Sequence, residues 1–227
     1  MPRYRIRYTK EGPARFISHL DLLRTFERAV RRAGLPVTLS QGFNPHPRMS
    51  FGLPLPVGVA GLSEYVDINL DTEVPLSSIV ESLGKSMPEG IRVTGSCPVD
   101  EGGAALMAEI ERSVYSMHFE PDCVPGGAEK LKSCLDHIMG LPLVTVKRTG
   151  KDGRESLFDI RPGLIGFNVL EEDGGLTLMA ELITGSALNI RPAEVLGAIR
   201  EYCGIGGDYA EITRVGLAGK DGKKLFM

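Results

Sequence analysis

The fold is predicted first by the segment Tyr4-Arg5-Ile6-Arg7-Tyr8, in which apolar and charged residues alternate. Successive side chains of a β-strand point to opposite faces, so a period of two indicates a half-buried strand over residues 3–9. A different pattern follows Ser18, whose hydroxyl can accept amides that a helix start leaves unpaired. Beyond His19-Leu20-Asp21, apolar residues recur at intervals of three and four. We therefore expect a helix over 19–33.

Later segments complete a regular order of elements. In the first half, the same two periodicities predict strands at 37–40, 64–70 and 91–94 and a helix at 75–87. With the first strand and helix, the order becomes βαββαβ, which is the split-βαβ or ferredoxin-like pattern. The second half repeats the pattern, with strands at 113–119, 143–147, 164–170, 176–183 and 211–215 and helices at 128–139 and 192–203.

The expected fold class is therefore α+β, with two tandem ferredoxin-like (split βαβ) domains that have antiparallel sheets. We expect the domains at residues 1–100 and 101–227, with a boundary at Asp100-Glu101-Gly102-Gly103, and a hairpin turn at Glu172-Asp173-Gly174-Gly175. The first domain includes a Pro- and Gly-rich loop over 42–62. Loops longer than about 12–15 residues are uncommon in compact domains and are often functional.

Composition narrows the class of protein. Of the 227 residues, 42% are apolar and 24% are charged, as in ordinary globular proteins. The chain contains neither a run of about 18 apolar residues nor the apolar centre of a signal peptide, so we expect a soluble, cytoplasmic protein with no membrane segment. None of the four cysteines forms a Cys-x-x-Cys pair. We therefore expect no metal, no cofactor and no disulfide scaffold.

The net charge of −3 conceals an uneven distribution. Residues 1–50 carry ten Lys or Arg and three Asp or Glu, a net charge of +7, whereas residues 51–140 carry −9. Arginines can pair with phosphates, and Tyr4, Tyr8, Phe16 and Phe43 are aromatic neighbours that could stack on bases. The candidate nucleic-acid or anion contacts are Arg15, Ser18, His19, Arg24, Arg28, Arg31, Arg32, Asn44, His46 and Arg48. An acidic protein partner or a plain solvated surface explains the same charges.

Two histidines are the candidate catalytic residues. His46 stands between Pro45 and Pro47 in the long loop, and His19 stands in the first turn of the helix, where free amides attract anions. Imidazoles titrate near neutral pH, so the two could act as acid and base in metal-free RNA cleavage. Alternatively, the prolines only shape a hairpin, His46 binds a carbonyl, and His19 belongs to an ordinary capping turn.

The second half offers two more candidate anion-binding residues. Arg161 and Arg191 each stand in an Ile-Arg-Pro tripeptide, and Arg191 directly precedes a predicted helix. A helix start favours anions. The alternative is structural, with Arg161 bracing Asp159 and Pro192 simply opening the helix at a position where its missing amide costs nothing.

Several segments resemble the radical-SAM-linked protein family. They are Phe16-Ile17-Ser18-His19-Leu20-Asp21, Arg28-Ala29-Val30-Arg31-Arg32-Ala33-Gly34-Leu35-Pro36, Ser40-Gln41-Gly42-Phe43-Asn44-Pro45-His46-Pro47-Arg48, Asp159-Ile160-Arg161-Pro162 and Arg191-Pro192-Ala193-Glu194-Val195-Leu196. In that family the domain is fused behind a radical SAM enzyme or encoded beside one. The resemblance therefore implies an accessory role with a radical SAM enzyme as partner. This chain lacks the Cys-x-x-x-Cys-x-x-Cys that holds the iron–sulfur cluster of such enzymes.

The expected function is that of a non-catalytic accessory protein to a radical SAM enzyme, which binds RNA (tRNA or rRNA) or presents a substrate. One alternative is a metal-independent endoribonuclease, because the tandem order also resembles enzymes that process CRISPR RNA. That likeness concerns the fold, and a fold does not give a function. The other alternative is a protein-interaction module whose basic face docks an acidic partner.

Overall fold

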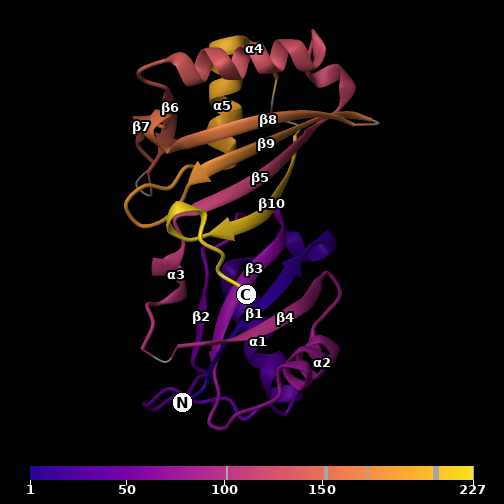
Figure 1. The fold of residues 1–227 in the computed structure, drawn as a ribbon, viewed down its shortest axis with the longest axis vertical. Coiled ribbons are helices and arrows are strands. Elements are labelled where there is room, and N and C mark those ends of the chain that lie inside the picture. The colour runs from indigo at the N-terminus through magenta and orange to yellow at the C-terminus, as the bar shows by residue number, and fades with distance from the viewer. Residues whose placement is uncertain (101, 151–152, 173, 207–209, 227) are drawn as a thin grey trace. The chain divides into compact units, whose positions relative to one another are not determined.

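The computed structural model describes residues 1–100, 102–150, 153–172, 174–206 and 210–226 (Figure 1). It is a mixed α+β protein with mostly antiparallel strand pairing and five α-helices among the described residues. Two compact units divide the chain: Met1–Glu111 with Arg214–Met227, and Arg112–Thr213. The expected boundary and the expected hairpin turn include residues 101 and 173, which lie outside the described residues.

The first unit alternates strands and helices. It contains β1 (Arg3–Lys10), α1 (His19–Arg32), β2 (Met49–Phe51), β3 (Ala60–Asn69), α2 (Leu76–Ser86), β4 (Ile91–Val99) and the single-turn α3 (Leu106–Glu109). β1 pairs antiparallel with both β3 and β4, and β2 pairs with β3. The expected strand at 37–40 is wrong. Val37 and Leu39 form only isolated bridges, because the chain turns back after Ser40 and the strand beside β3 comes from Met49–Phe51 instead.

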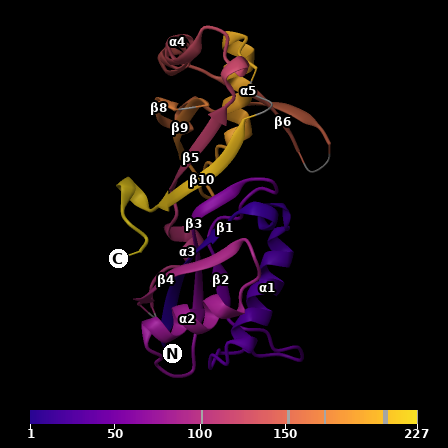
Figure 2. The same cartoon turned by 90° about the vertical axis from the view of Figure 1, so that its right-hand side faces the viewer.

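The start of α1 follows from its sequence. The Ser18 hydroxyl accepts the amide of Asp21 at 3.2 Å, as predicted, and Gly34 adopts a left-handed φ of 64° just beyond the last turn. Buried residues of α1, such as Phe26, pack with Ile79 of α2 and Ile6 of β1 in one core. Both helices therefore lie on the same face of the strands (Figure 2).

The second unit contains a similar alternation. It comprises β5 (Arg112–Phe119), α4 (Gly127–Gly140), β6 (Thr145–Thr149), β7 (Glu155–Asp159), β8 (Leu164–Glu172), β9 (Gly175–Ile183) and α5 (Pro192–Cys203). β5 pairs with β9, which pairs with β8, whereas β6 and β7 form a separate hairpin whose second strand was not predicted. A disulfide joins Cys134 of α4 to Cys203 of α5. We expected no disulfide scaffold from the four cysteines, and the sequence does not indicate that these two, 69 residues apart, lie side by side.

The strand β10 (Glu211–Ala218) contains the point at which the chain passes from one unit to the other. In the second unit the strand order is β10-β5-β9-β8, and in the first it is β4-β1-β3-β10, with β2 also on β3. Residues from Arg214 onward belong to the first unit, so the C-terminal segment returns to the N-terminal elements. None of the described helices has both the length and the apolar composition that crossing a bilayer requires.

Candidate nucleic-acid interface

The arginine face of α1, made of Arg24, Arg28, Arg31 and Arg32, is exposed. Arg24 contacts Asp21 at 3.4 Å, an exposed ion pair of the kind that contributes at most about 1 kcal/mol. Arg28 and Arg31 have no acidic side chain within 4.0 Å among the described residues. Arg32 instead donates to the Ser86 carbonyl at the end of α2. Three guanidinium groups one helical turn apart are thus available to an external anion.

A hairpin tip stands beside this face. The Ser40 amide donates to the His46 carbonyl at 2.7 Å, and the His46 amide donates to the Ser40 hydroxyl at 3.0 Å. These two bonds close a short loop in which Phe43 is fully exposed, with a relative exposure of 106%, and Asn44 is exposed as well. The His46 Nδ1 atom lies 3.4 Å from a carboxylate oxygen of Glu27 on α1. The tip is therefore held against the helix that carries the arginines.

Arg15 and Arg48 are two further predicted nucleic-acid contacts. The Arg15 guanidinium stands over the ring of Phe16 at 4.9 Å, and Phe16 is 59% exposed. The Arg48 side chain is exposed, whereas its backbone pairs with Thr38 and Asn69. Phe16 is thus a second exposed ring of the first unit besides Phe43, and it is already in contact with an arginine.

His19 is separated from His46. Glu27, the neighbour of His46, is eight residues further along α1 than His19, a distance of about 12 Å along the helix axis. The His19 ring packs edge-on against Phe51, and its Nδ1 atom is buried without a hydrogen-bond partner in the described chain. Burial, and then the charge of Lys10, lower the pKa of His19. The geometry does not bring the two imidazoles together as an acid and a base.

The arginines of β1 point away from α1, and Arg5 among them is bonded inside the unit. Arg5 is 3% exposed and binds its cross-strand neighbour Asp67 at 2.8 and 3.0 Å, Glu109 at 3.0 Å, and the Leu225 carbonyl at 2.9 Å. Burial opposes the positive charge, but the hydrogen bonds to both carboxylates outweigh it and raise the pKa of Arg5. Sequence alternation placed these arginines opposite the apolar face. It gave no sign that the C-terminal segment covers them.

A second buried ion pair lies on the first unit. Arg214 is fully buried and donates to both carboxylate oxygens of Glu64. Lys10, 1% exposed, donates to the Ile17 carbonyl at 2.9 Å, and burial together with the charge of Arg214 lowers its pKa. The expected stacking residues Tyr4 and Tyr8 are 7% and 3% exposed. They are core residues, because the apolar face of β1 packs against α1, and no base can reach them.

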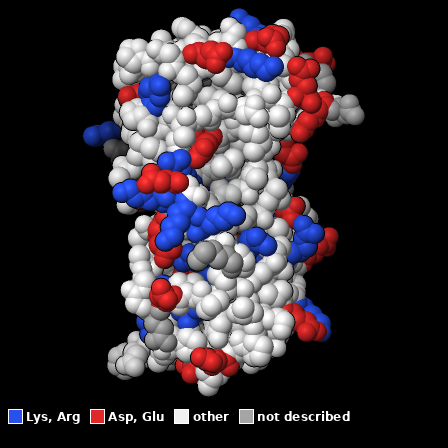
Figure 3. All heavy atoms as spheres, viewed as in Figure 1, with Lys and Arg blue, Asp and Glu red and all other residues white. Residues whose placement is uncertain are grey.

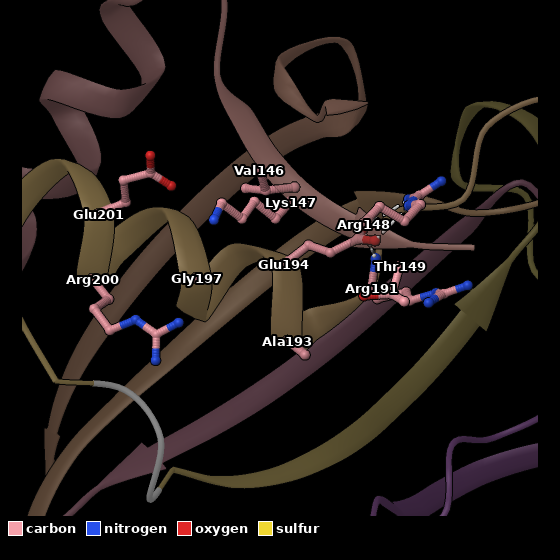
Figure 4. A pocket seen from close by; sticks show the side chains of 10 residues that line it. All are labelled: Val146, Lys147, Arg148, Thr149, Arg191, Ala193, Glu194, Gly197, Arg200 and Glu201. Carbon is pink, nitrogen blue, oxygen red and sulfur yellow. Dashed lines mark hydrogen bonds and ion pairs between the residues drawn. The ribbon is translucent and has the colours of Figure 1, made fainter. Parts of the chain in front are cut away.

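Arg161 and Arg191 lie in the second unit and differ in role. The Arg161 guanidinium donates twice to the Met139 carbonyl, at 3.1 and 2.8 Å, and so ties the last turn of α4. Arg191 is exposed at the rim of a pocket of about 600 Å³ between β6 and α5 (Figure 4). The Glu194 carboxylate already accepts the Arg191 amide at 2.9 Å and binds Arg148. The carboxylate of Glu194, within the first turn of α5, thus already caps the start of this helix.

Comparisons with known proteins identify a family. The model described as "Uncharacterized protein conserved in bacteria (DUF2344)" matches residues 3–192. No curated protein matches the chain by sequence. Among solved structures, one from "Crystal Structure of a Cbf5-Nop10-Gar1 Complex" is 13% identical with a TM-score of 0.47, and it covers 96% of this chain, which spans 50% of that one. An unknown protein from Galdieria sulphuraria is 11% identical with a TM-score of 0.24, covering 95% of this chain and 99% of that one.

Proposed function

The chain belongs to this family of uncharacterized bacterial proteins, and from that premise we propose that it binds single-stranded segments of tRNA or rRNA through its first unit. One observation carries the proposal: Arg24, Arg28 and Arg31 are exposed without a strong acidic partner, beside a loop tip that presents Phe43 to solvent. The proposed RNA interface consists of these four residues with Asn44, His46 and Arg48.

The charges of the interface suit a phosphate backbone. Guanidinium groups bind phosphate oxygens through two parallel hydrogen bonds, and every phosphate contact releases counterions. Arg28 and Arg31 need break no ion pair to bind, and Arg24 would give up only its exposed contact with Asp21. The cost of exchanging the existing contacts for phosphate contacts is therefore small.

The exposed rings favour single-stranded over double-stranded RNA. Bases in a duplex are already stacked on one another, whereas unpaired bases can stack on an aromatic side chain. Phe43 at the hairpin tip and Phe16 beside Arg15 both present ring faces that the unit does not bury. Base stacking of this kind tolerates sequence differences, so we expect weak sequence preference.

The accessory role rests on the resemblance to the radical-SAM-linked family. The partner proposed on that basis is a radical SAM enzyme, for which this chain would bind RNA or present a substrate. His46 lies beside Glu27, which is about 12 Å further along the α1 axis than His19, and this placement favours an RNA-binding over an RNA-cleaving role for the interface. Intact RNA after incubation with the protein in EDTA is the expected result, and cleavage that His46→Ala abolishes would favour the endoribonuclease alternative instead.

The strand orders support the finer description of the fold. In a ferredoxin-like domain the four strands lie in the order 4-1-3-2. The second unit's order β10-β5-β9-β8 matches it, as does β4-β1-β3 with β2 on β3 in the first unit. We therefore retain two tandem ferredoxin-like domains, at about residues 1–100 and 101–227, as part of the proposal. In the first of these domains, β10 beside β3 is an extra strand that the ferredoxin-like order does not include.

The test compares two charge-reversal variants by fluorescence anisotropy with a labelled single-stranded RNA. Arg24→Glu, Arg28→Glu and Arg31→Glu together should weaken binding by about 100-fold or more at moderate salt, because three phosphate contacts become repulsive. The matched control reverses three exposed cations elsewhere, Arg92, Lys130 and Lys132, and changes the net charge equally. Equal losses in the two variants would show that net charge alone attracts the RNA, and would overturn the proposed interface.

The partnership has a separate test. The radical SAM enzyme encoded in the same genome should co-purify with this chain after nuclease treatment, or change its rate when the chain is added. If neither occurs, the accessory role fails while RNA binding stands. A protein partner that is captured after nuclease treatment by a chain that binds no RNA would favour the protein-interaction alternative.

A further inference from the structure

A second cationic surface lies on the opposite face of the first unit from α1. It is a pocket of about 560 Å³, a volume within the range of small-molecule sites. It is formed by β1, the end of β4, the residues Asp100, Gly103, Ala104 and Glu109, and the C-terminal segment. In the space-filling view, Lys and Arg side chains gather beside the place marked C in Figure 1 (Figure 3). Because Arg3 and Arg5 point away from the core that α1 shares with β1, this pocket is distinct from the proposed RNA interface.

The pocket holds more positive charge than the unit neutralises. Arg5 and Glu109 bind each other at 3.0 Å, so neither is available to a ligand. Arg3, Lys223 and Lys224 remain, and the further described carboxylates beside them are that of the exposed Asp100 in the lining and that of Asp67, which lies 3.8 Å from Arg3. Neither lysine has an ion pair with a described residue. The four cations Arg3, Arg5, Lys223 and Lys224 therefore stand against the three carboxylates of Asp67, Asp100 and Glu109, a net charge of about +1 by simple count of ionised side chains at neutral pH.

Arg3 is the decisive residue, because its guanidinium is nearly enclosed but poorly bonded. The side chain is 12% exposed, and its Nε and Nη2 atoms are buried without a hydrogen-bond partner in the described structure. The Asp67 carboxylate, 3.8 Å from Nε, is already engaged by Arg5 at 2.8 and 3.0 Å. A single long bond, 3.4 Å, runs from Nη1 to the Gly103 carbonyl. Buried charged donors without acceptors are costly, so such a group calls for a missing acceptor.

The backbone leaves room for this guanidinium at Gly103. A Cβ atom at this position would lie 2.8 Å from Arg3 Nη2, and therefore an alanine there would push the guanidinium out of place. Because Gly103 has no side chain, the guanidinium of Arg3 can lie against the pocket wall, where it makes few hydrogen bonds. An acceptor that reaches Nε and Nη2 would satisfy the two donors at once.

We propose that this pocket binds the phosphate or diphosphate group of a small molecule, with Arg3 as the bidentate donor and Lys223 and Lys224 as flanking charges. The planar guanidinium fork matches two phosphate oxygens, and the lysines act as point charges that can follow a multiply charged anion. A single carboxylate would use the fork but leave both lysines without a partner. The proposal is independent of RNA binding, because it uses the other face of the unit.

The test titrates inorganic pyrophosphate into the full-length protein, with calorimetry for affinity and ¹⁵N NMR for location. We expect saturable binding that shifts the Gly103 amide and Arg3 Nε resonances. Lys223→Gln with Lys224→Gln should weaken it by about tenfold or more, since two charge-assisted contacts are lost at exposed positions that do not hold the fold. Arg3→Lys keeps the charge but loses the fork, so it should also weaken binding, whereas Arg92→Gln with Lys130→Gln should not.

The outcomes separate this proposal from the RNA interface. The Arg24→Gln, Arg28→Gln and Arg31→Gln variant should bind pyrophosphate as the wild type does, whatever happens to its RNA affinity. Absence of saturable binding, shifts that spread over α1 instead of Gly103, or an unchanged affinity in the double lysine variant would each overturn the proposed pocket.

Discussion

Arginines occur at similar density on α1 and β1, and the two elements use them in different ways. On α1 the charged side chains face water, and the one ion pair among Arg24, Arg28 and Arg31 is exposed. On β1, Arg5 is enclosed by two carboxylates and a carbonyl contributed by β3, α3 and the C-terminal segment. A group of arginines in a sequence therefore indicates a nucleic-acid interface only where the fold does not pair these arginines with carboxylates of the same protein.

The largest effect that tests the contrast between α1 and β1 concerns the buried pair of Arg5 and Asp67. Asp67→Ala would leave Arg5 without its closest partner, and breaking a buried pair in this way costs about 3–5 kcal/mol in the free energy of unfolding. Denaturant titration should detect the loss as a lower midpoint. Glu81→Ala, which removes an exposed carboxylate from its pair with Lys85, should leave the denaturation midpoint close to that of the wild type.

A double variant sharpens the same prediction. Arg5→Met with Asp67→Leu removes both charges and should lose less stability than Asp67→Ala alone, because apolar side chains then replace the pair and Arg5 is not left buried without Asp67. If Asp67→Ala unfolded at the wild-type denaturant concentration, the buried arrangement of Arg5 would be wrong.

A smaller effect is expected at the exposed hairpin tip, and it should appear in binding instead of stability. Phe43→Ala removes a ring that touches no core, so the free energy of unfolding should stay within about 0.5 kcal/mol of the wild type. RNA affinity should fall by about 1–3 kcal/mol for the loss of one stacked base. Leu157→Ala, at another exposed apolar position, is the control and should leave RNA affinity unchanged. An unaltered affinity in Phe43→Ala would remove the tip from the interface.

The smallest effect concerns His19, the first residue of α1, whose ring packs against Phe51. Its pKa is lowered, so the unfolded chain binds a proton more readily than the folded chain as the pH falls through about 6.5. The free energy of unfolding should therefore decrease on going from pH 7 towards pH 5, and His19→Gln should make that decrease shallower. Denaturant titrations across this range provide the measurement, and a steeper decrease in the variant would contradict the assigned environment.

Local signals in the sequence were sufficient for most elements. The Ser18 cap, the apolar residues of α1 and Pro192 at the first position of α5 predicted both helices to within a residue. The strand at 37–40 failed, since a hairpin tip closed by Ser40 and His46 depends on bonds across the loop that no periodicity reveals. β7 was missed for a similar reason, because it pairs only with β6 in a hairpin separate from the main strands.

The candidate site was predictable only in part. The exposure of the α1 arginines follows from their position opposite Phe26 and its neighbours, which is a property of the helix alone. The fate of Arg5 depends on Glu109 and Leu225, more than a hundred residues away along the chain, and no local pattern encodes these contacts. Tyr4 and Tyr8 were expected to stack on bases, although they lie on the face of β1 that packs in the core with Phe26 of α1.

The most direct test of the contrast between α1 and β1 is the salt dependence of RNA affinity. We predict that Arg24→Gln, Arg28→Gln and Arg31→Gln together reduce the slope of log K against log salt by about 2, the value for three phosphate contacts on a single strand. The Arg5→Met, Asp67→Leu variant, whose arginine is buried, should keep the wild-type slope. An unchanged slope in the α1 variant, or an equal reduction in both variants, would contradict the assignment of RNA binding to the exposed arginines of α1.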